Sequence, residues 1–308
     1  MKNLFYILIC IIIIIYFLFS PGDALSASKT GLLLWFEQIL PTLLPFSIIS
    51  NLLICSNLFS AIRRKFSLPF SPEKAFTILC GFLFGFPIGS KLTADFYKQG
   101  ALCESDARIL CCFTNNLSPV FISGYVCTSM LHRPDWILPI YLTLFVPSLA
   151  YGLIMLLFTR KKMLPDKAHT KKPASAFCIN MQLLDTGIIH SFLTMIKLCG
   201  YIMLFSILAR FLMQIPQLSA TVKIFLTCSL EITNGIALLT NAPLNEHMLY
   251  VCTVAFLSFG GISGIAQTGS MLSGTNLKLK DYVIQRVLLT ILCTACAIIY
   301  RLFLSVIL

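Results

Sequence analysis

The stretch Val222–Thr240, VKIFLTCSLEITNGIALLT, decides how this chain folds. It is apolar and close to the length of about 20 residues that a membrane-spanning helix needs. Yet Glu231, Thr233 and Asn234 stand at its centre. Polar groups at that depth cost free energy, so those that occur usually face a cavity or a partner helix. The stretch therefore predicts a membrane helix that is interrupted at its middle, close to a functional site.

The whole chain has the composition of a membrane protein. Its 308 residues are 57% hydrophobic and 11% charged, and the mean hydropathy is +0.88. A soluble domain carries about 25% charged residues, so this chain could not cover a water-facing surface. We therefore predict an all-α, polytopic helical bundle in the cell membrane, with the lipid bilayer as its surroundings.

Positive charge is concentrated in three short polar stretches between apolar runs. The chain has 23 Lys and Arg against 12 Asp and Glu, and the basic stretches are 61–74, 160–173 and 278–286. The positive-inside rule assigns such loops to the cytoplasm. A nucleic-acid-binding patch would carry interleaved aromatic residues, which these loops lack, so no nucleic-acid partner is expected.

Neither the cysteines nor known catalytic motifs indicate a reaction. Most of the 13 Cys lie inside apolar runs, where cysteine behaves as a small hydrophobic residue. No two pairs have the spacing of zinc ligands. The sequence contains no nucleophile elbow, phosphate-binding loop or zinc-protease motif. We expect a protein that is not an enzyme and that holds no metal or cofactor.

Several apolar runs predict ordinary helices. Leu4–Ser20 predicts a first membrane helix with a cytoplasmic N-terminus, and the alternative is a signal peptide cleaved near Ala24–Ser28. Gly31–Phe59 and the run from Leu184 each predict an amphipathic lead-in followed by a span, the first of them kinked at its prolines. Trp136–Thr159 predicts a span that its first residue anchors at the membrane interface.

Other segments are broken. Ala75–Gly89 is too short for a comfortable span and predicts a re-entrant or broken helix. An amphipathic helix on the membrane surface is expected to follow it, with Lys91 in a solvated ion pair. The polar run Thr114–Pro119 interrupts the next helix, and Gly260–Gly264 interrupts the helix predicted over Met248–Leu272.

The two halves of the chain repeat this order of features. Thr30-Gly31 corresponds to Thr186-Gly187, and the break after Phe113 corresponds to the break at Gly260. With one re-entrant element, each half crosses three times, so the second half is upside down relative to the first. Inverted repeats of this kind are typical of secondary transporters. The expected organisation is an N-terminal helix at 1–21, a first gate-type repeat at 22–159, a basic cytoplasmic linker at 160–175 and a second gate-type repeat at 176–308.

The polar residues at the breaks form the predicted binding site. Asn and Gln offer donors and acceptors that suit a base-like or sugar-like solute, and Glu231 is suited to coupling transport to a proton or cation. The alternative for Glu231 is an ion pair with Lys197 or Lys91 that locks the bundle, and Glu37 is a weaker candidate near the start of a span. The predicted substrate-binding residues are Thr114, Asn115, Asn116, Ser118, Glu231, Thr233, Asn234, Ser263 and Gln267.

Five motifs are spread over nearly the whole chain. They are GLLLWFEQILPTLLPF at Gly31–Phe46, GFPIGSK at Gly85–Lys91, FTNNLSP at Phe113–Pro119, LEITNG at Leu230–Gly235, and SFGG at Ser258–Gly261 with Gln267 beyond it. In sequence and order they resemble the sporulation integral membrane protein YlbJ family. That family carries the nucleoside recognition, or Gate, domain, which it shares with concentrative nucleoside transporters, ferrous-iron transport GTPases and spore maturation proteins.

The resemblance implies a membrane protein of endospore-forming bacteria that is needed for a normal spore. Two functions stay open. The first is a secondary transporter or channel for a small polar, nucleoside-like solute. The second is a non-transporting structural membrane component of the sporulation machinery, and a homo-oligomer is compatible with both. Gly264 and Ile265 stand where the family leads us to expect bulkier or polar residues, so ligand contacts there are not carried over.

Overall fold

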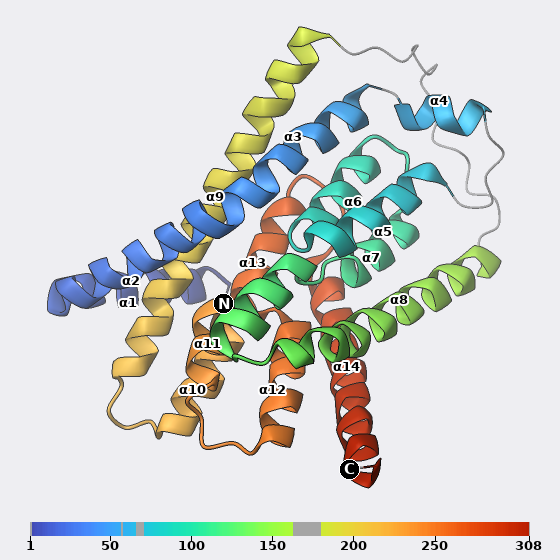
Figure 1. Ribbon diagram of the computed structural model, residues 1–308. Helices are drawn as coiled ribbons and strands as arrows, with labels where there is room; N and C mark the ends of the chain where they lie inside the picture. The colour runs from blue at the N-terminus through green and yellow to red at the C-terminus, as the bar shows by residue number, and fades with distance from the viewer. Residues whose placement is uncertain (1, 57, 66–70, 163–179, 308) are drawn as a thin grey trace.

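The structure is a computed structural model that describes residues 2–56, 58–65, 71–162 and 180–307, and all regular structure in these ranges is helical (Figure 1). This confirms the all-α prediction. Two elements, η1 and η2, are π-helical, and η3 is a single 3-10 turn. In chain order the elements are α1 (Lys2–Phe19), α2 (Pro21–Leu34), η1 (Trp35–Ile39), α3 (Leu40–Cys55), α4 (Leu58–Lys65), α5 (Pro72–Phe84), α6 (Ile88–Lys98), α7 (Glu104–Phe113), η2 (Phe121–Met130), η3 (Pro134–Trp136), α8 (Ile137–Lys162), α9 (Met181–Gln214), α10 (Ala220–Leu230), α11 (Ile232–Leu239), α12 (Glu246–Phe259), α13 (Gly261–Met271) and α14 (Leu279–Ile307).

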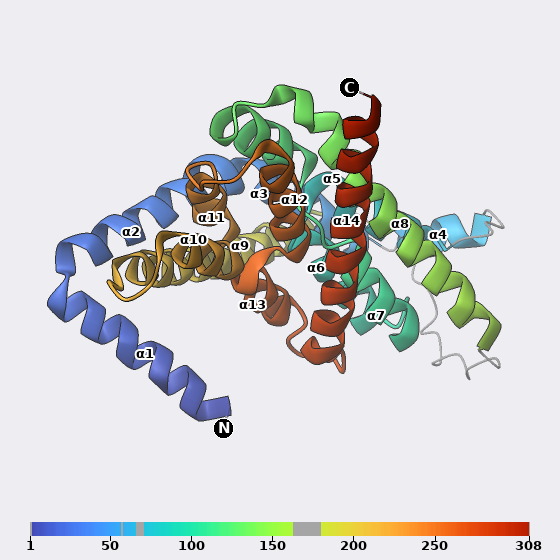
Figure 2. The same ribbon diagram turned by 90° about the horizontal axis from the view of Figure 1, so that it is seen from below.

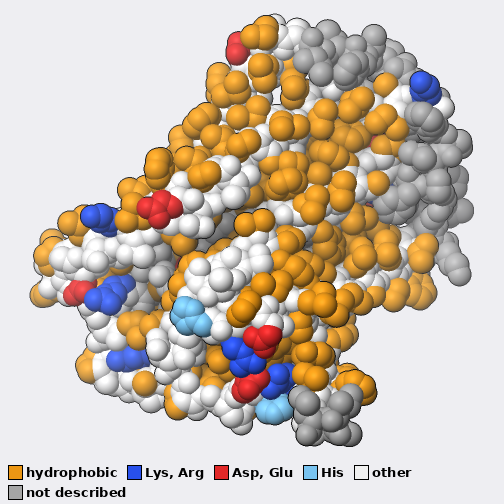
Figure 3. Space-filling model, in the orientation of Figure 1, with side chains coloured by type: hydrophobic (Ala, Val, Ile, Leu, Met, Phe, Trp, Pro, Cys, Tyr) orange, Lys and Arg blue, Asp and Glu red, His pale blue; other side chains and the backbone are white. Residues whose placement is uncertain are grey.

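Several helical segments are long and apolar enough to cross a bilayer. Leu138, Ile291 and Leu302 on two of them are each more than half exposed, and hydrophobic atoms cover much of the face in Figure 3. Such a surface is stable only when hydrocarbon covers it. Within the described ranges the five candidate spans are Pro21–Cys55, Pro134–Thr159, Met181–Gln214, Glu246–Met271 and Leu279–Ser305.

Ion pairs mark the two ends of the bundle. At one end Glu246 accepts hydrogen bonds from Arg133 and Arg301 at 3.0 and 3.2 Å. At the other end Asp281 pairs with Arg108 at 3.3 Å. About 20 residues of α14 separate Asp281 from Arg301, and they span about 30 Å of helix. This is close to the thickness of the hydrocarbon core of a bilayer, so the charged groups lie where its two surfaces are expected.

The two expected lead-ins are parts of continuous helices. α2, η1 and α3 form one uninterrupted helix over Pro21–Cys55, and α9 runs without a break over Met181–Gln214. The wide π-helical turn of η1 lies directly before Pro41. The helix therefore passes the proline by changing its hydrogen-bond register, where the sequence suggested a separate element.

The first apolar run forms α1, which turns at Ser20 and projects from the bundle beside α2 (Figure 2). Tyr16 near its end meets Phe211 of α9 edge-on, with ring centroids 5.4 Å apart. Asp23, just past the turn, accepts a hydrogen bond from Arg210 at 2.7 Å. These contacts attach α1 and the start of α2 to the last turns of α9.

α9 packs antiparallel against α2 and α3 (Figure 1). A Cβ on Gly31 would lie 2.9 Å from the Ser206 hydroxyl, so the helices approach this closely only because the residue is glycine. Further along the pair, a Cβ on Gly187 would lie 3.7 Å from that of Asn51. The sequence offset that relates Gly31 to Gly187 also relates Ser50, the neighbour of Asn51, to Ser206.

Broken helices occur in both halves of the described chain. α5 passes into α6 through Gly85–Pro87, and α7 ends at Phe113 before η2 continues. In the second half α10 gives way to α11 at Glu231, and α12 gives way to α13 at Gly260. Each half ends in a long helix, α8 in the first and α14 in the second. The predicted breaks are thus present at the expected positions.

α6 is buried in the bundle, so the prediction that it lies on the membrane surface is wrong. Leu92 and Phe96 are at most 1% exposed, and Lys91 is 8% exposed. The Lys91 ammonium donates to Asp95 at 2.8 Å and to Asn51 of α3 at 2.7 Å. The polar face of α6 therefore meets polar partners inside the protein, which an amphipathic pattern alone cannot distinguish from a face in water.

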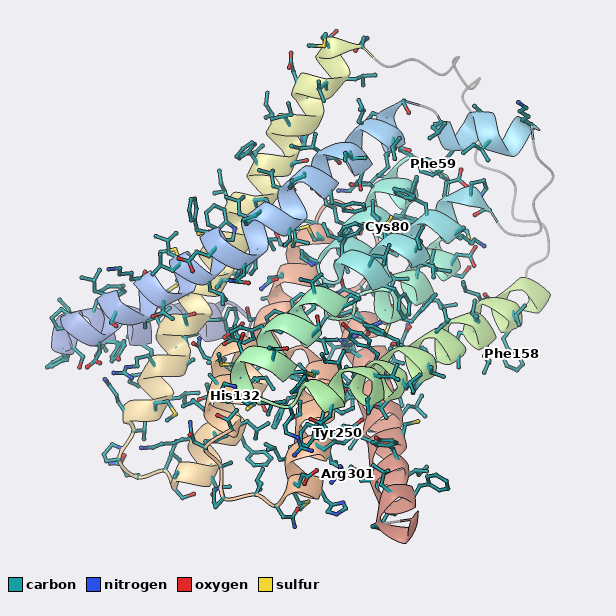
Figure 4. All side chains as sticks on the ribbon, in the orientation of Figure 1. Phe59, Cys80, His132, Phe158, Tyr250 and Arg301 are labelled. Carbon is teal, nitrogen blue, oxygen red and sulfur yellow. The ribbon has the colours of Figure 1, made fainter. Side chains whose placement is uncertain are left out.

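Trp136 is also buried, at 3% exposure, where an interfacial anchor was predicted. Its ring meets Tyr250 edge-on at 5.2 Å, and the Arg133 guanidinium lies 4.6 Å from its centroid. The Arg301 guanidinium lies 5.6 Å from the Tyr250 ring centroid (Figure 4). These contacts join the start of α8 in the first half to α12 and α14 in the second.

Candidate functional site

The helix breaks of the two halves contact one another. In the first half the Phe86 N–H donates to the Asn116 carbonyl at 2.6 Å, which joins one break to the other. In the second half a Cβ on Gly261 would lie 3.2 Å from the Leu230 carbonyl. The Phe86 ring of the first half lies against Gly260 of the second half, since a Cβ on Gly260 would lie 3.6 Å from the ring.

The spacing of Gly81, Gly85 and Gly89 predicts close packing, and the structure agrees. A Cβ on Gly81 or Gly89 would stand 2.4 Å from the Thr114 carbonyl oxygen. Gly85 has a φ of 73°, and a Cβ there would lie 2.5 Å from the Ser118 nitrogen. Only glycine lets α5 and α6 approach the second broken helix this closely.

A cavity of about 410 Å³ lies among the breaks, and both halves line it. Its volume is within the range of about 300–1,000 Å³ found for small-molecule sites. Ser118 from the first half faces the same cavity as Glu231, Thr233, Ser263 and Gln267 from the second. The structure thus brings five of the nine predicted residues together.

Glu231 caps α11 with its carboxylate. Oε1 accepts hydrogen bonds from the N–H and the hydroxyl of Thr233 at 3.1 and 2.7 Å, and Oε2 accepts one from the Asn234 N–H at 2.8 Å. Glu231 is only 4% exposed. The N-terminus of a helix favours a negative charge, so α11 itself stabilises this carboxylate.

The lysine lock predicted as an alternative is not formed. Among the side chains that the structure describes, Glu231 makes no ion pair, while Lys91 pairs with Asp95. Lys197 is exposed on α9. The negative charge of Glu231 is therefore left facing the cavity and the end of α11.

Ser263 and Gln267 lie one turn apart on α13 and bond to each other. The Gln267 amide donates to the Ser263 hydroxyl at 3.1 Å, and the two residues are 6% and 3% exposed. Tyr125 of η2 also lines the cavity and donates to the Thr233 carbonyl at 3.0 Å. Sequence reasoning did not single out Tyr125, because one tyrosine in an apolar stretch gives no signal.

The other predicted residues are not part of the cavity lining. The Asn115 amide donates to the hydroxyls of Thr268 and Tyr282 at 2.8 and 3.0 Å, and the Asn234 amide donates to the Ser206 hydroxyl at 3.2 Å. These amides hold broken helices to their neighbours, and their role as solute ligands stays a prediction. The residues outside the lining are Thr114, Asn115, Asn116 and Asn234.

Arg286 contacts one helix break in each half, at Asn116 and at Phe259. Its place in the chain instead predicts a cytoplasmic cluster with Lys278 and Lys280. Both lysines are exposed, whereas Arg286 is 1% exposed. Its Nη1 donates to the Asn116 side-chain oxygen at 3.1 Å and its Nε to the Phe259 carbonyl at 3.4 Å. That carbonyl ends α12, where a positive charge is favoured. The apolar run Val287–Leu289 directly after Arg286 is the signal that could have separated it from the lysines.

The cavity reaches the surface beside η1 and η2. Gln38, Thr42 and Thr128 line it and are themselves exposed. Gln38 is the midpoint of Pro21–Cys55, so this mouth lies midway along a candidate membrane span. Glu37, the weaker candidate, is exposed beside it and makes no hydrogen bond or ion pair with residues that the structure describes. Sequence reasoning missed Gln38 and Thr42, because it placed the site at the broken helices alone.

Apolar spans with charged groups at both ends and a polar site at the helix breaks define a multi-pass integral membrane protein. Among curated proteins, the chain is similar to the sporulation integral membrane protein YlbJ of Bacillus subtilis (strain 168). The two are 27% identical over an alignment of 310 positions, which covers 87% of this chain and 75% of the relative. No family model matches the chain, the Gate domain included. No solved structure matches it.

Proposed function

We propose that this protein is a secondary transporter or channel for a small polar, nucleoside-like solute and that it serves sporulation. The observation that carries the proposal is the cavity that both halves line where their broken helices meet. A broken helix presents free backbone groups and helix ends at a depth where a continuous helix presents none. In transporters, such breaks form the substrate site.

The proposal includes two inverted repeats. The order of broken and long helices is the same in both halves. The contact of Gly31 with Ser206 and the contact of Gly187 with Asn51 are near-equivalents in an antiparallel helix pair. An approximate twofold axis in the plane of the membrane would produce this exchange. Rocking of one repeat against the other would then open the cavity to each side in turn.

The link to sporulation rests on the relative. Its name describes an integral membrane protein of sporulation in Bacillus subtilis. The name mentions no transport, so the solute is argued from the cavity and from the resemblance of the five motifs. A volume of about 410 Å³ would hold a nucleoside-sized molecule.

The competing proposal is a structural membrane component that moves no solute. One observation favours it: the Asn115 amide is engaged with Thr268 and Tyr282, and the Asn116 oxygen with Ser148 and Arg286. Polar groups paired in this way would lock the broken helices together. A lock, however, does not require a cavity that reaches the surface.

A flux screen separates the two proposals. The purified chain is placed in lipid vesicles, and uptake and export of nucleosides, sugars and amines are followed with and without a proton gradient. Flux of at least one small polar solute above that of protein-free vesicles is expected. A correctly inserted chain that moves none of them would support the structural role.

A further inference from the structure

We infer that the ligand of this cavity is a hydrogen-bond donor, an amino or ammonium group beside a planar ring. The inference rests on the proposed function, because it names the chemical class of solute for the same cavity. It follows from which donors and acceptors of the lining are already paired within the protein.

Donors beside Glu231 are used by the lining itself, although the Ser263 hydroxyl and the second N–H of Gln267 are not. The Thr233 hydroxyl donates to Glu231 at 2.7 Å, and the Tyr125 hydroxyl donates to the Thr233 carbonyl at 3.0 Å. The Gln267 amide donates to Ser263 at 3.1 Å. A hydroxyl carries one proton, so neither Thr233 nor Tyr125 has a donor left for a ligand.

Acceptors remain in the same lining. The Gln267 side-chain oxygen accepts no hydrogen bond from residues that the structure describes, and Gln267 lines the cavity. Oε2 of Glu231 accepts a single hydrogen bond, whereas a carboxylate offers about four lone-pair sites in all. A carboxylate binds a donor more strongly than a neutral acceptor does, so a ligand that brings N–H groups is held more tightly than one that brings oxygens.

Charge and ring faces favour the same class. In the described part of the chain, Glu231 is the one charged residue of the cavity lining. Phe121 and Tyr125, stacked with centroids 5.0 Å apart, add aromatic surface. Aromatic faces attract cations and stack on planar rings. Arg286 lies outside the lining and directs donors to oxygens of the protein.

Equilibrium binding to the full chain in lipid nanodiscs tests this inference. The first probes are 2-phenylethylamine, 2-phenylethanol and phenylacetate, which share a ring and differ in the ammonium, hydroxyl or carboxylate group. Cytidine and uridine form a second pair: cytidine carries a ring amino group beside an N3 acceptor, and uridine carries a ring carbonyl beside a single N3–H. If phenylethylamine binds, it should bind about tenfold or more tightly than phenylacetate. If cytidine binds, it should bind more tightly than uridine by a similar factor. The pair that responds distinguishes an ammonium from a ring amino group.

Two substitutions connect this preference to named atoms. Glu231→Gln should weaken binding of the donor-bearing probe by about ten- to a hundredfold. Glu104→Gln, an exposed carboxylate on α7 that pairs with Arg108, is the matched control and should leave binding unchanged. Should Glu231→Gln fail to fold, Gln267→Met removes the free acceptor at similar size and should reduce the preference for the donor.

Three results would overturn the inference. They are binding of phenylacetate as tight as that of phenylethylamine or of uridine as tight as that of cytidine, no binding of phenylethylamine or cytidine at about 10 mM, or a preference that survives Glu231→Gln, or Gln267→Met where the first variant does not fold. Binding is measured without transport, so its outcome is independent of the flux screen. A chain that binds amines but moves no solute would contradict the proposed function and leave this inference standing.

Discussion

At the scale of single residues, Glu231 combines two roles. Its carboxylate caps α11 through Thr233 and Asn234, and the same side chain lines the cavity. The sequence identified Glu231 because an acid in the middle of an apolar run is costly. It could not show that the partner would be a helix end, because that depends on the backbone turning at this residue, with φ −145° and ψ 116°.

Replacing Glu231 by Gln should abolish transport and sporulation while the protein still folds. The amide oxygen can keep part of the cap, so we expect a loss of stability of about 1 kcal/mol. Melting of the solubilised chain and sporulation efficiency of cells that depend on it are the two measurements. Normal sporulation together with unchanged melting would leave Glu231 without either role.

Arg286 should be a stability determinant at the contact between halves. Arg286→Met leaves the Asn116 side-chain oxygen and the Phe259 carbonyl without this donor, at an expected cost of about 1–3 kcal/mol. Lys280→Met, at an exposed position in the first turn of α14, should stay within about 0.5 kcal/mol. Equal melting temperatures for the two variants would refute the contact.

At the scale of elements, the breaks depend on glycine. Gly81→Ala and Gly89→Ala each place a Cβ 2.4 Å from the Thr114 carbonyl oxygen, which is too close for van der Waals contact. We expect each to cost about 1–3 kcal/mol in thermal melting. Gly200→Ala on α9 is the control, because a Cβ there meets no atom within 4 Å. It should be neutral or stabilising by about 0.5–1 kcal/mol. The same effect at all three positions would argue against close packing at the break.

The elements also show where sequence reasoning succeeds and fails. Helix breaks can be predicted from the sequence, because polar and glycine residues inside apolar runs are rare and costly, as at Glu231 and Gly260. Whether the polar face of a helix is buried cannot be predicted in the same way, because burial depends on partners that are distant in the sequence. α6 shows this with Lys91, whose partner Asn51 lies 40 residues away along the chain. The same holds for the cavity mouth, which Gln38 forms because η1 and η2 line the same cavity in the folded chain.

At the scale of the whole molecule, the charged ends fix an orientation. Glu104, Arg108 and Asp281 lie at the same end, beside the basic stretch with Lys278, and we expect that end to face the cytoplasm. The linker that carries Lys167 should face the same side, and it lies outside the described residues. Asp135, on the loop before α8, should then face the exterior.

Labelling from outside the cell tests this orientation. A membrane-impermeant thiol reagent should modify Asp135→Cys and spare Glu104→Cys, each compared with the parent chain to account for its own cysteines. Both side chains are well exposed, at 58% and 45%, so access is decided by the membrane. Modification of Glu104→Cys with protection of Asp135→Cys would reverse the whole assignment.

The central claim is that solute passes through the cavity at the helix breaks. Gly124 lines that cavity, and a Cβ there meets no atom within 4 Å, so Gly124→Phe should fill it without disturbing the fold. Gly200→Phe on α9 is the matched control away from the cavity. The direct measurement is influx of labelled cytidine into vesicles that carry each chain. The account predicts influx for the parent and for Gly200→Phe and only the rate of protein-free vesicles for Gly124→Phe, whereas equal influx for the two variants, or none for the parent, would contradict it.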